Sequence, residues 1–195
     1  KLLRVQINST TGKVEQLPGI ITDSSPIGEY DQLLSYGSFI TKAHEIGYED
    51  NVNLFGVGYN YILHPATSYS NEYVKLKSKI EEVYEKTKEK SVIMGHSQGT
   101  SFVSIFISNF TTPEWAQKYI DSVIFLAPAF AGWPSFQRIF TQSFSPFKTC
   151  DELKKSIMRM PGLHIMTPNH AIYGDIPIIH NWHQDYDQDN ATQVV

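Results

Sequence analysis

The five residues Gly95–Gly99 carry the clearest chemical signal of this chain, because Gly-His-Ser-Gln-Gly matches the pattern G-x-S-x-G. In that pattern a serine lies on a sharp turn between a strand and a helix, and its hydroxyl stands clear of the sheet as a nucleophile. Glycines at positions 95 and 99 would let strand and helix pass closely. We therefore predict that Ser97 is a catalytic nucleophile and that the backbone N–H of Gln98 stabilises an oxyanion.

The segments around this turn have the patterns that the motif needs. Ser91–Met94 is a short apolar run typical of a buried parallel strand, and residues 100–108 suit an apolar helix. Alternation of strand and helix continues on both sides, which predicts an α/β fold of the α/β-hydrolase type with a mostly parallel sheet and flanking helices. Further strands are expected at 2–8, 14–17, 52–57 and 122–127, and further helices at 30–46 and 70–90.

Composition narrows the class of protein. The chain has 195 residues, of which 41% are hydrophobic and 18% charged, as expected for one globular domain. Its net charge of −4 and its lack of a basic run argue against a nucleic-acid partner. Cys150 is the only cysteine, so no internal disulfide is possible. The first residues resemble a strand rather than a signal peptide, and no apolar run approaches the length of a membrane span.

Three N-x-S/T sequons favour the secretory pathway, with a lysosomal or extracellular destination. The candidate glycosylation sites are Asn8, Asn109 and Asn190.

The pattern changes after residue 128. Residues 129–150 are rich in phenylalanine, which is typical of a packed core but also suits an apolar cap over an acyl chain. We expect a short helix at 151–160 and an extended or looped segment at 161–168. The predicted organisation is a hydrolase core at 1–128, a cap-like segment at 129–183 and a polar tail at 184–195.

Several segments together carry a family resemblance: Leu17-Pro-Gly-Ile20, Gly58-Tyr-Asn-Tyr61, the motif at 95–99, the strand and turn Asp121–Gly132, and the segment Leu153–Pro168. In their order and spacing the chain resembles the lecithin:cholesterol acyltransferase and lysosomal phospholipase A2 family of α/β-hydrolases. The family's P-Y-D-W-R motif is replaced here by Gly58–Ile62, and its Leu-Gly-Ala-Pro by Leu126-Ala127-Pro128.

The resemblance implies a function in lipid metabolism. Members act as acyltransferases, lipases or phospholipases, which implies a phospholipid, sterol or other acyl lipid as substrate, met at a membrane or lipoprotein surface. It also places Ile20 in the oxyanion segment, so the backbone N–H of Ile20 is the candidate second donor beside Gln98. No cofactor and no metal are implied.

The acid and base of a serine hydrolase are harder to place. In this fold they follow the serine in the order aspartate, then histidine, and the resemblance puts both beyond the point that matches Val195. Within the chain, Asp175 with His180 satisfies the order, although no clear strand precedes either residue. His96 adjoins the nucleophile and is expected to point away from where a base must lie. We therefore expect the strands that carry the acid and base to be missing here, which would leave the strand at 123–127 without a neighbour, and the 195-residue chain alone poorly soluble and without esterase activity.

Two classes of function follow. The leading hypothesis is a lipid acyl-ester hydrolase or O-acyltransferase in which Ser97 is acylated and the acyl group passes to water or an alcohol. The alternative is a non-catalytic relative that binds lipid or a protein partner and lacks the Asp–His pair. A thioesterase or peptidase on the same motif is a third option.

Overall fold

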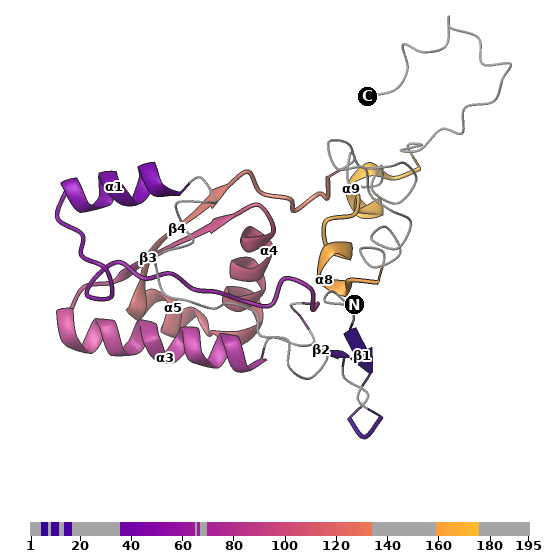
Figure 1. Cartoon of the computed structure of the whole chain (residues 1–195), viewed down its shortest axis with the longest axis horizontal. Helices are drawn as coiled ribbons and strands as arrows, with labels where there is room; N and C mark the ends of the chain where they lie inside the picture. The colour runs from indigo at the N-terminus through magenta and orange to yellow at the C-terminus, as the bar shows by residue number, and fades with distance from the viewer. Residues whose placement is uncertain are drawn as a thin grey trace, which may run out of the picture.

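The computed structural model describes residues 5–7, 9–11, 14–16, 36–64, 66, 70–133 and 159–175. Two separate strand pairs are present in these ranges (Figure 1). Near the N-terminus, β1 (Val5–Ile7) pairs antiparallel with β2 (Val14–Gln16). The second pair is parallel and joins β3 (Ser91–His96) to β4 (Ile120–Leu126). Strands were expected at all four places.

The connection from β3 to β4 is mostly helical, as is usual between parallel strands. It consists of α4 (Gln98–Ile105), a π-helical turn η1 (Phe106–Phe110) and α5 (Pro113–Tyr119). The hydroxyl oxygen of Thr112 accepts the Trp115 N–H at 3.2 Å and caps α5. This unit is the part of the expected α/β fold that positions Ser97.

The core lies on one face of the β3–β4 pair, where α3 (Ser70–Thr87), α4 and α5 gather (Figure 1). Aromatic rings dominate it. The fully buried Tyr73 of α3 lies 4.6 Å from the ring centroid of Phe102 and 4.4 Å from that of Phe110. Burial raises the pKa of Tyr73, so the phenol stays neutral. The strands contribute Ile93, Val123 and Phe125 to this core.

The opposite face of the β3–β4 pair is far more open. Val92 and Ile124 are 50% and 44% exposed, and Leu126 is 40% exposed. The helix α1 (Gly37–Glu45) lies on this side in Figure 1. Within the described ranges β4 pairs with β3 alone. The two faces of one small sheet thus differ sharply in burial.

The segment expected to be extended or looped at 161–168 instead begins with a short helix, α8 (Pro161–His164), and a second one, α9 (His170–Tyr173), follows. The expectation was wrong at 161–164, whereas 165–168 is a turn and bend as a loop would be. Contacts distant in sequence fix the segment. The Trp133 N–H donates to the carbonyl of Met166 at 2.8 Å, and the Asn169 N–H donates to that of Ala131 at 3.0 Å. Gly132 lies between them with φ +84°, and a Cβ there would meet the Thr167 carbonyl oxygen at 2.2 Å.

The prediction of a strand at 52–57 was also wrong. The N–H groups of Val52, Asn53 and Leu54 all donate to the Glu49 carbonyl, which closes a turn. Asn51 has φ +60°, a conformation that no regular strand contains. The helix expected at 70–90 is confirmed as α3. The described part of the helix expected at 30–46 is α1. Most of the helix expected at 151–160 lies outside the described residues.

Candidate active site

Ser97 lies at the turn between β3 and α4 with φ +52° and ψ −121°. Positive φ is uncommon for a residue with a side chain, and conformations of this kind cost on the order of 1–3 kcal/mol. The Ser97 N–H donates to the carbonyl of Leu126 at 2.9 Å, so the turn begins at the last rung of the parallel ladder. A strand, a strained serine and a helix follow one another as a G-x-S-x-G turn requires.

Thr100 holds the turn from inside the helix. This residue is fully buried, and its N–H and hydroxyl both donate to the Ser97 carbonyl, at 3.0 and 2.6 Å. Two donors on one carbonyl fix the peptide plane that follows the serine. The strain at Ser97 is therefore supported by a buried neighbour three residues on.

The two glycines of the motif have different roles. A Cβ on Gly95 would lie 2.8 Å from the Gly99 carbonyl oxygen and 3.0 Å from the Cα of Thr100, and both are backbone atoms. Strand and helix therefore pass too closely at Gly95 for any side chain. A Cβ on Gly99 would meet only the Tyr59 hydroxyl, at an ordinary 3.6 Å. The close passage requires glycine at the strand position alone.

Gln98 is the first residue of α4, so its backbone N–H belongs to the first turn, where no acceptor exists within the helix. The helix dipole adds positive potential there. Its side chain has a further role that the sequence did not indicate. Nε2 donates to the carbonyl of Gly162 at 2.6 Å and to that of Tyr61 at 3.1 Å. The sequence offered one signal for this role, which is a polar amide at position 98, where the motif accepts any residue.

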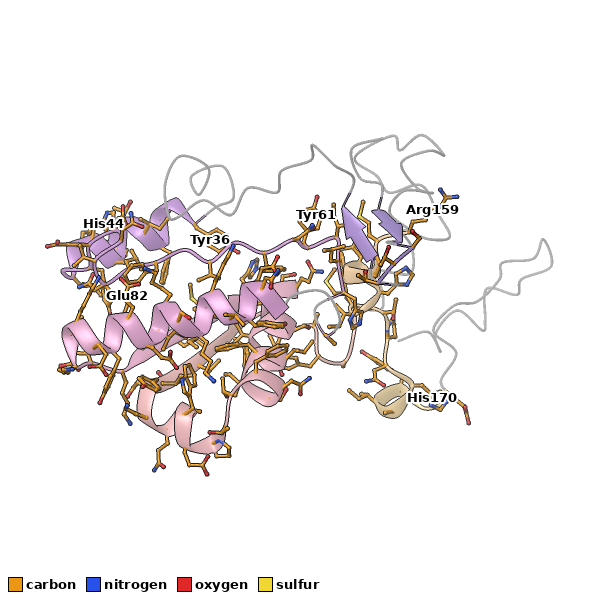
Figure 2. All side chains as sticks on the ribbon, turned by 90° about the horizontal axis from the view of Figure 1, so that it is seen from below. Tyr36, His44, Tyr61, Glu82, Arg159 and His170 are labelled. Atoms are coloured by element: carbon orange, nitrogen blue, oxygen red, sulfur yellow. The ribbon has the colours of Figure 1, made fainter. Side chains whose placement is uncertain are left out.

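Two tyrosines line the neighbourhood of the turn. Tyr59 stacks on Phe102 with centroids 4.5 Å apart, and burial, assisted by Tyr36, raises the pKa of Tyr59 to about 12. Its hydroxyl therefore stays protonated at neutral pH beside Gly99. The Tyr36 hydroxyl is hydrogen-bonded to Nδ1 of His96, and the two rings meet edge to face at 5.6 Å. His96 is thus engaged by Tyr36 at the start of α1 (Figure 2).

Of the other predicted site residues, some lie within the described ranges and some lie outside them. Asp175 is exposed, and its carboxylate lies 3.2 Å from Nε2 of His170, which Figure 2 places well away from Tyr36. Asn109 is exposed on η1, as a glycosylation site must be. Ile20, His180, Asn8 and Asn190 lie outside the described residues.

The described ranges contain neither a metal-binding cluster nor a membrane-spanning helix. No group of three or more His, Cys, Asp and Glu side chains there could hold a metal ion. No helix in the same ranges has both the length and the apolar character that crossing a bilayer requires.

A strand, a positive-φ serine and a helix N-terminus in this order are the local architecture of the α/β-hydrolase class. The sequence model of the family described as lecithin:cholesterol acyltransferase matches residues 21–144, more than half of the chain. The chain therefore belongs to the lecithin:cholesterol acyltransferase family, which is of the α/β-hydrolase type.

A curated relative agrees with this assignment. Lecithin-cholesterol acyltransferase-like 1 of Arabidopsis thaliana is 30% identical over 145 residues, which cover 65% of this chain and 33% of the relative. The matched part thus spans about a third of the relative's length.

Proposed function

We propose that the complete protein transfers acyl groups from lipid esters through an acyl-enzyme on Ser97, to water or to an acceptor alcohol. The observation that carries the proposal is the strained backbone of Ser97, with φ +52° at the N-terminus of α4. Membership of the lecithin:cholesterol acyltransferase family supports an acyl lipid as substrate.

In the proposed reaction the Ser97 oxygen attacks the ester carbonyl carbon while a general base takes the hydroxyl proton. The carbonyl oxygen becomes an oxyanion, which the backbone N–H groups of Gln98 and Ile20 stabilise. The carbon–oxygen bond to the leaving alcohol then breaks, and that alcohol receives the proton. Water or an acceptor alcohol attacks the acyl-serine in the same way and releases Ser97. The family resemblance implies an aspartate and a histidine as the acid and the base.

The strain at Ser97 favours an enzyme over the non-catalytic alternative. A lipid-binding or partner-binding relative has no use for a hydroxyl held in a costly conformation, because binding apolar chains needs only apolar surface. Thr100 donates two hydrogen bonds, from its N–H and its hydroxyl, to the Ser97 carbonyl in the same turn. A lipid surface as the meeting place, a secretory compartment, glycosylation and the division at residues 128 and 183 remain predictions.

A fluorophosphonate probe tests the proposal directly, because an activated serine oxygen attacks its phosphorus, displaces fluoride and becomes phosphonylated. Incubation of the complete protein with the probe should give one adduct, which peptide mass spectrometry should locate at Ser97. Ser97→Ala should abolish both the adduct and hydrolysis of a lipid ester. Ser108→Ala is the matched control, since Ser108 is an exposed serine on η1 whose hydroxyl donates to the Ser104 carbonyl. An unlabelled wild-type protein, or full activity in Ser97→Ala, would remove Ser97 from the mechanism.

A further inference from the structure

We propose that the side chain of Gln98 is a positioning residue that locks α8 against the nucleophile turn, so that docking of α8 and alignment of the oxyanion donor depend on one amide. The inference rests on the proposed function for its catalytic part. Its structural part, the docking of α8, stands on contacts alone.

The contacts are specific for a double donor. Nε2 of Gln98 reaches the carbonyl oxygens of Tyr61 at 3.1 Å and Gly162 at 2.6 Å. A carboxamide NH₂ group has two N–H bonds, one for each carbonyl, and a carboxylate of the same shape has none. The acceptors lie 37 and 64 residues from Gln98 in the sequence, so the amide joins three distant segments.

The junction around these bonds is tightly packed. The Gly162 N–H donates to the Ile62 carbonyl at 2.9 Å. A Cβ on Gly162 would lie 2.1 Å from the Tyr61 carbonyl oxygen and 2.4 Å from that of Leu63, so the two backbones touch. Ile62 and Met160 are each only 2% exposed. The carbonyl of the buried Gly162, left without its donor, cannot readily turn to water, which makes loss of this bond the costlier of the two, since the bond to Tyr61 is exposed.

Gln98 is also adjacent to the proposed nucleophile. The backbone N–H of Gln98 directly follows Ser97, and it is the proposed first oxyanion donor. A side chain anchored at both acceptors fixes the orientation of this residue at the start of α4. Release of the anchor therefore frees α8 and loosens the peptide that carries the donor.

Gln98→Glu distinguishes hydrogen-bond donation by the side chain from the space that the side chain fills. The change keeps size and shape but puts an ionised carboxylate opposite two carbonyl oxygens, which raises the pKa of the introduced group above the ordinary value of about 4.3. Its protonated form can still donate to one carbonyl. Docking of α8 in this variant should therefore be present below that raised pKa and lost as the pH rises through it.

The experiment uses the complete protein in four forms: wild type, Gln98→Glu, Gln98→Met and Gln117→Glu. Gln117 is exposed on α5 and receives the same charge change as a matched control. Hydrogen exchange at the Gly162 amide reports docking without any need for activity, because that N–H is bonded to Ile62. The rate of fluorophosphonate labelling at Ser97 reports the catalytic part. Each variant is compared with wild type at about pH 5 and about pH 8, which bracket a raised carboxyl pKa.

At about pH 8 both Gln98 variants should exchange the Gly162 amide faster than wild type and label Ser97 about tenfold more slowly, as expected for losing the part-buried hydrogen bond to the Gly162 carbonyl. At about pH 5 Gln98→Glu should recover towards wild type, whereas Gln98→Met should not. Gln117→Glu should match wild type throughout.

Unchanged exchange at Gly162 in both Gln98 variants would overturn the docking role. Faster exchange with unchanged labelling would overturn the link to the reaction. A wild-type protein that takes no label, yet shows the predicted exchange, would overturn the proposed function and the catalytic link while supporting the docking role.

Discussion

The aromatic core and the junction at Gln98 are stabilised in opposite ways. The core between α3, α4 and β4 is held by side chains, with Tyr73 and Phe106 fully buried among other rings. The junction is held by main-chain carbonyls, one amide and Gly162, with almost no room for a side chain. Burial of apolar area is tolerant of small shifts, whereas backbone contact is not. We therefore expect the aromatic core and the junction to lose their structure independently of each other.

Breaking the core should have the largest effect. Phe106→Ala removes a fully buried ring that lies 5.8 Å from Tyr73 and 5.9 Å from Trp115, and should lower the free energy of unfolding by about 3–5 kcal/mol. Chemical denaturation of the complete protein measures this loss. Phe39→Ala is the control, because Phe39 on α1 is 47% exposed, and its loss should cost far less.

Breaking the junction should have a smaller and local effect. Gly162→Ala forces a methyl group against the carbonyls of Tyr61 and Leu63, so α8 should separate from the nucleophile turn at a cost of about 1–3 kcal/mol. Limited proteolysis at 160–167 should accelerate while the core stays protected. Gly174→Ala strains a residue with φ +58° but adds a methyl that meets nothing within 4 Å, so it tests backbone strain without crowding and should accelerate proteolysis at 160–167 less than Gly162→Ala does. A global loss of stability in Gly162→Ala would show that the two regions are not independent.

A substitution at the end of β4 should stabilise the protein, in contrast to the two preceding ones. Ala127 has φ +46°, and in the family that the chain resembles a glycine follows this strand. Left-handed backbone costs a non-glycine residue about 1–2 kcal/mol, of which the greater freedom of unfolded glycine offsets roughly half. Ala127→Gly should therefore stabilise the complete protein by up to about 1 kcal/mol, measured as a raised denaturation midpoint. Ala116→Gly within α5 should destabilise it by a similar amount.

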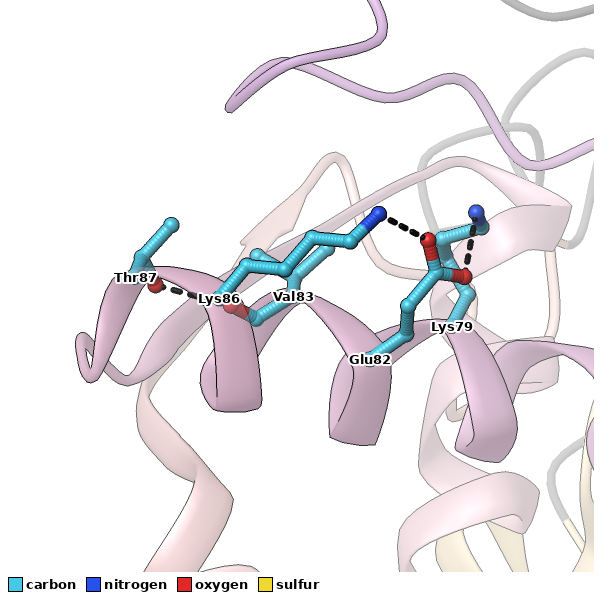
Figure 3. A network of polar contacts seen from close by, with 5 residues as sticks. All are labelled: Lys79, Glu82, Val83, Lys86 and Thr87. Atoms are coloured by element: carbon cyan, nitrogen blue, oxygen red, sulfur yellow. Dashed lines mark hydrogen bonds and ion pairs between the residues drawn. The ribbon is translucent and has the colours of Figure 1, made fainter.

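The surface of α3 should contribute least. Glu82 is hydrogen-bonded to Lys79 at 2.8 Å and to Lys86 at 2.6 Å, which lowers the pKa of its carboxyl to about 2 (Figure 3). Because the folded-state pKa is depressed, any stabilisation is present above the unfolded pKa and is lost as the pH falls through about 2. All three side chains are exposed, so salt screens the network. Glu82→Gln should change the melting temperature only at low ionic strength, and not at physiological salt.

The core was predictable from the sequence and the junction was not. Apolar periodicity gave α3, and the short apolar runs gave β3 and β4, because these residues are buried by their own pattern. The same reasoning failed at 52–57, because Val52 and Leu54 alternate as in a strand but donate their N–H groups to the Glu49 carbonyl in a turn, where Val52 is 58% exposed. It failed again at 161–164, where distant main-chain contacts form α8.

At the site itself, the motif predicted the turn but not its support. The pattern indicated that Ser97 follows a strand and starts a helix, which the structure shows. The bonds of Thr100 and Gln98 depend on a carbonyl three residues back and on carbonyls far along the chain, and periodicity carries no such information. The roles of Ser97, Ile20 and the backbone N–H of Gln98 stay predictions.

The torsion of Ser97 also bears on how this chain could evolve. Glycine adopts φ +52° without penalty, so a single replacement at position 97 would relieve the turn and raise stability. Stabilising replacements are readily accessible to natural sequences wherever function does not oppose them. A lineage that no longer needed the hydroxyl would drift towards that glycine, and then towards relaxed packing at the strand position that Gly95 now occupies. This chain has both Ser97 and Gly95, the pair that the proposed chemistry requires at this turn.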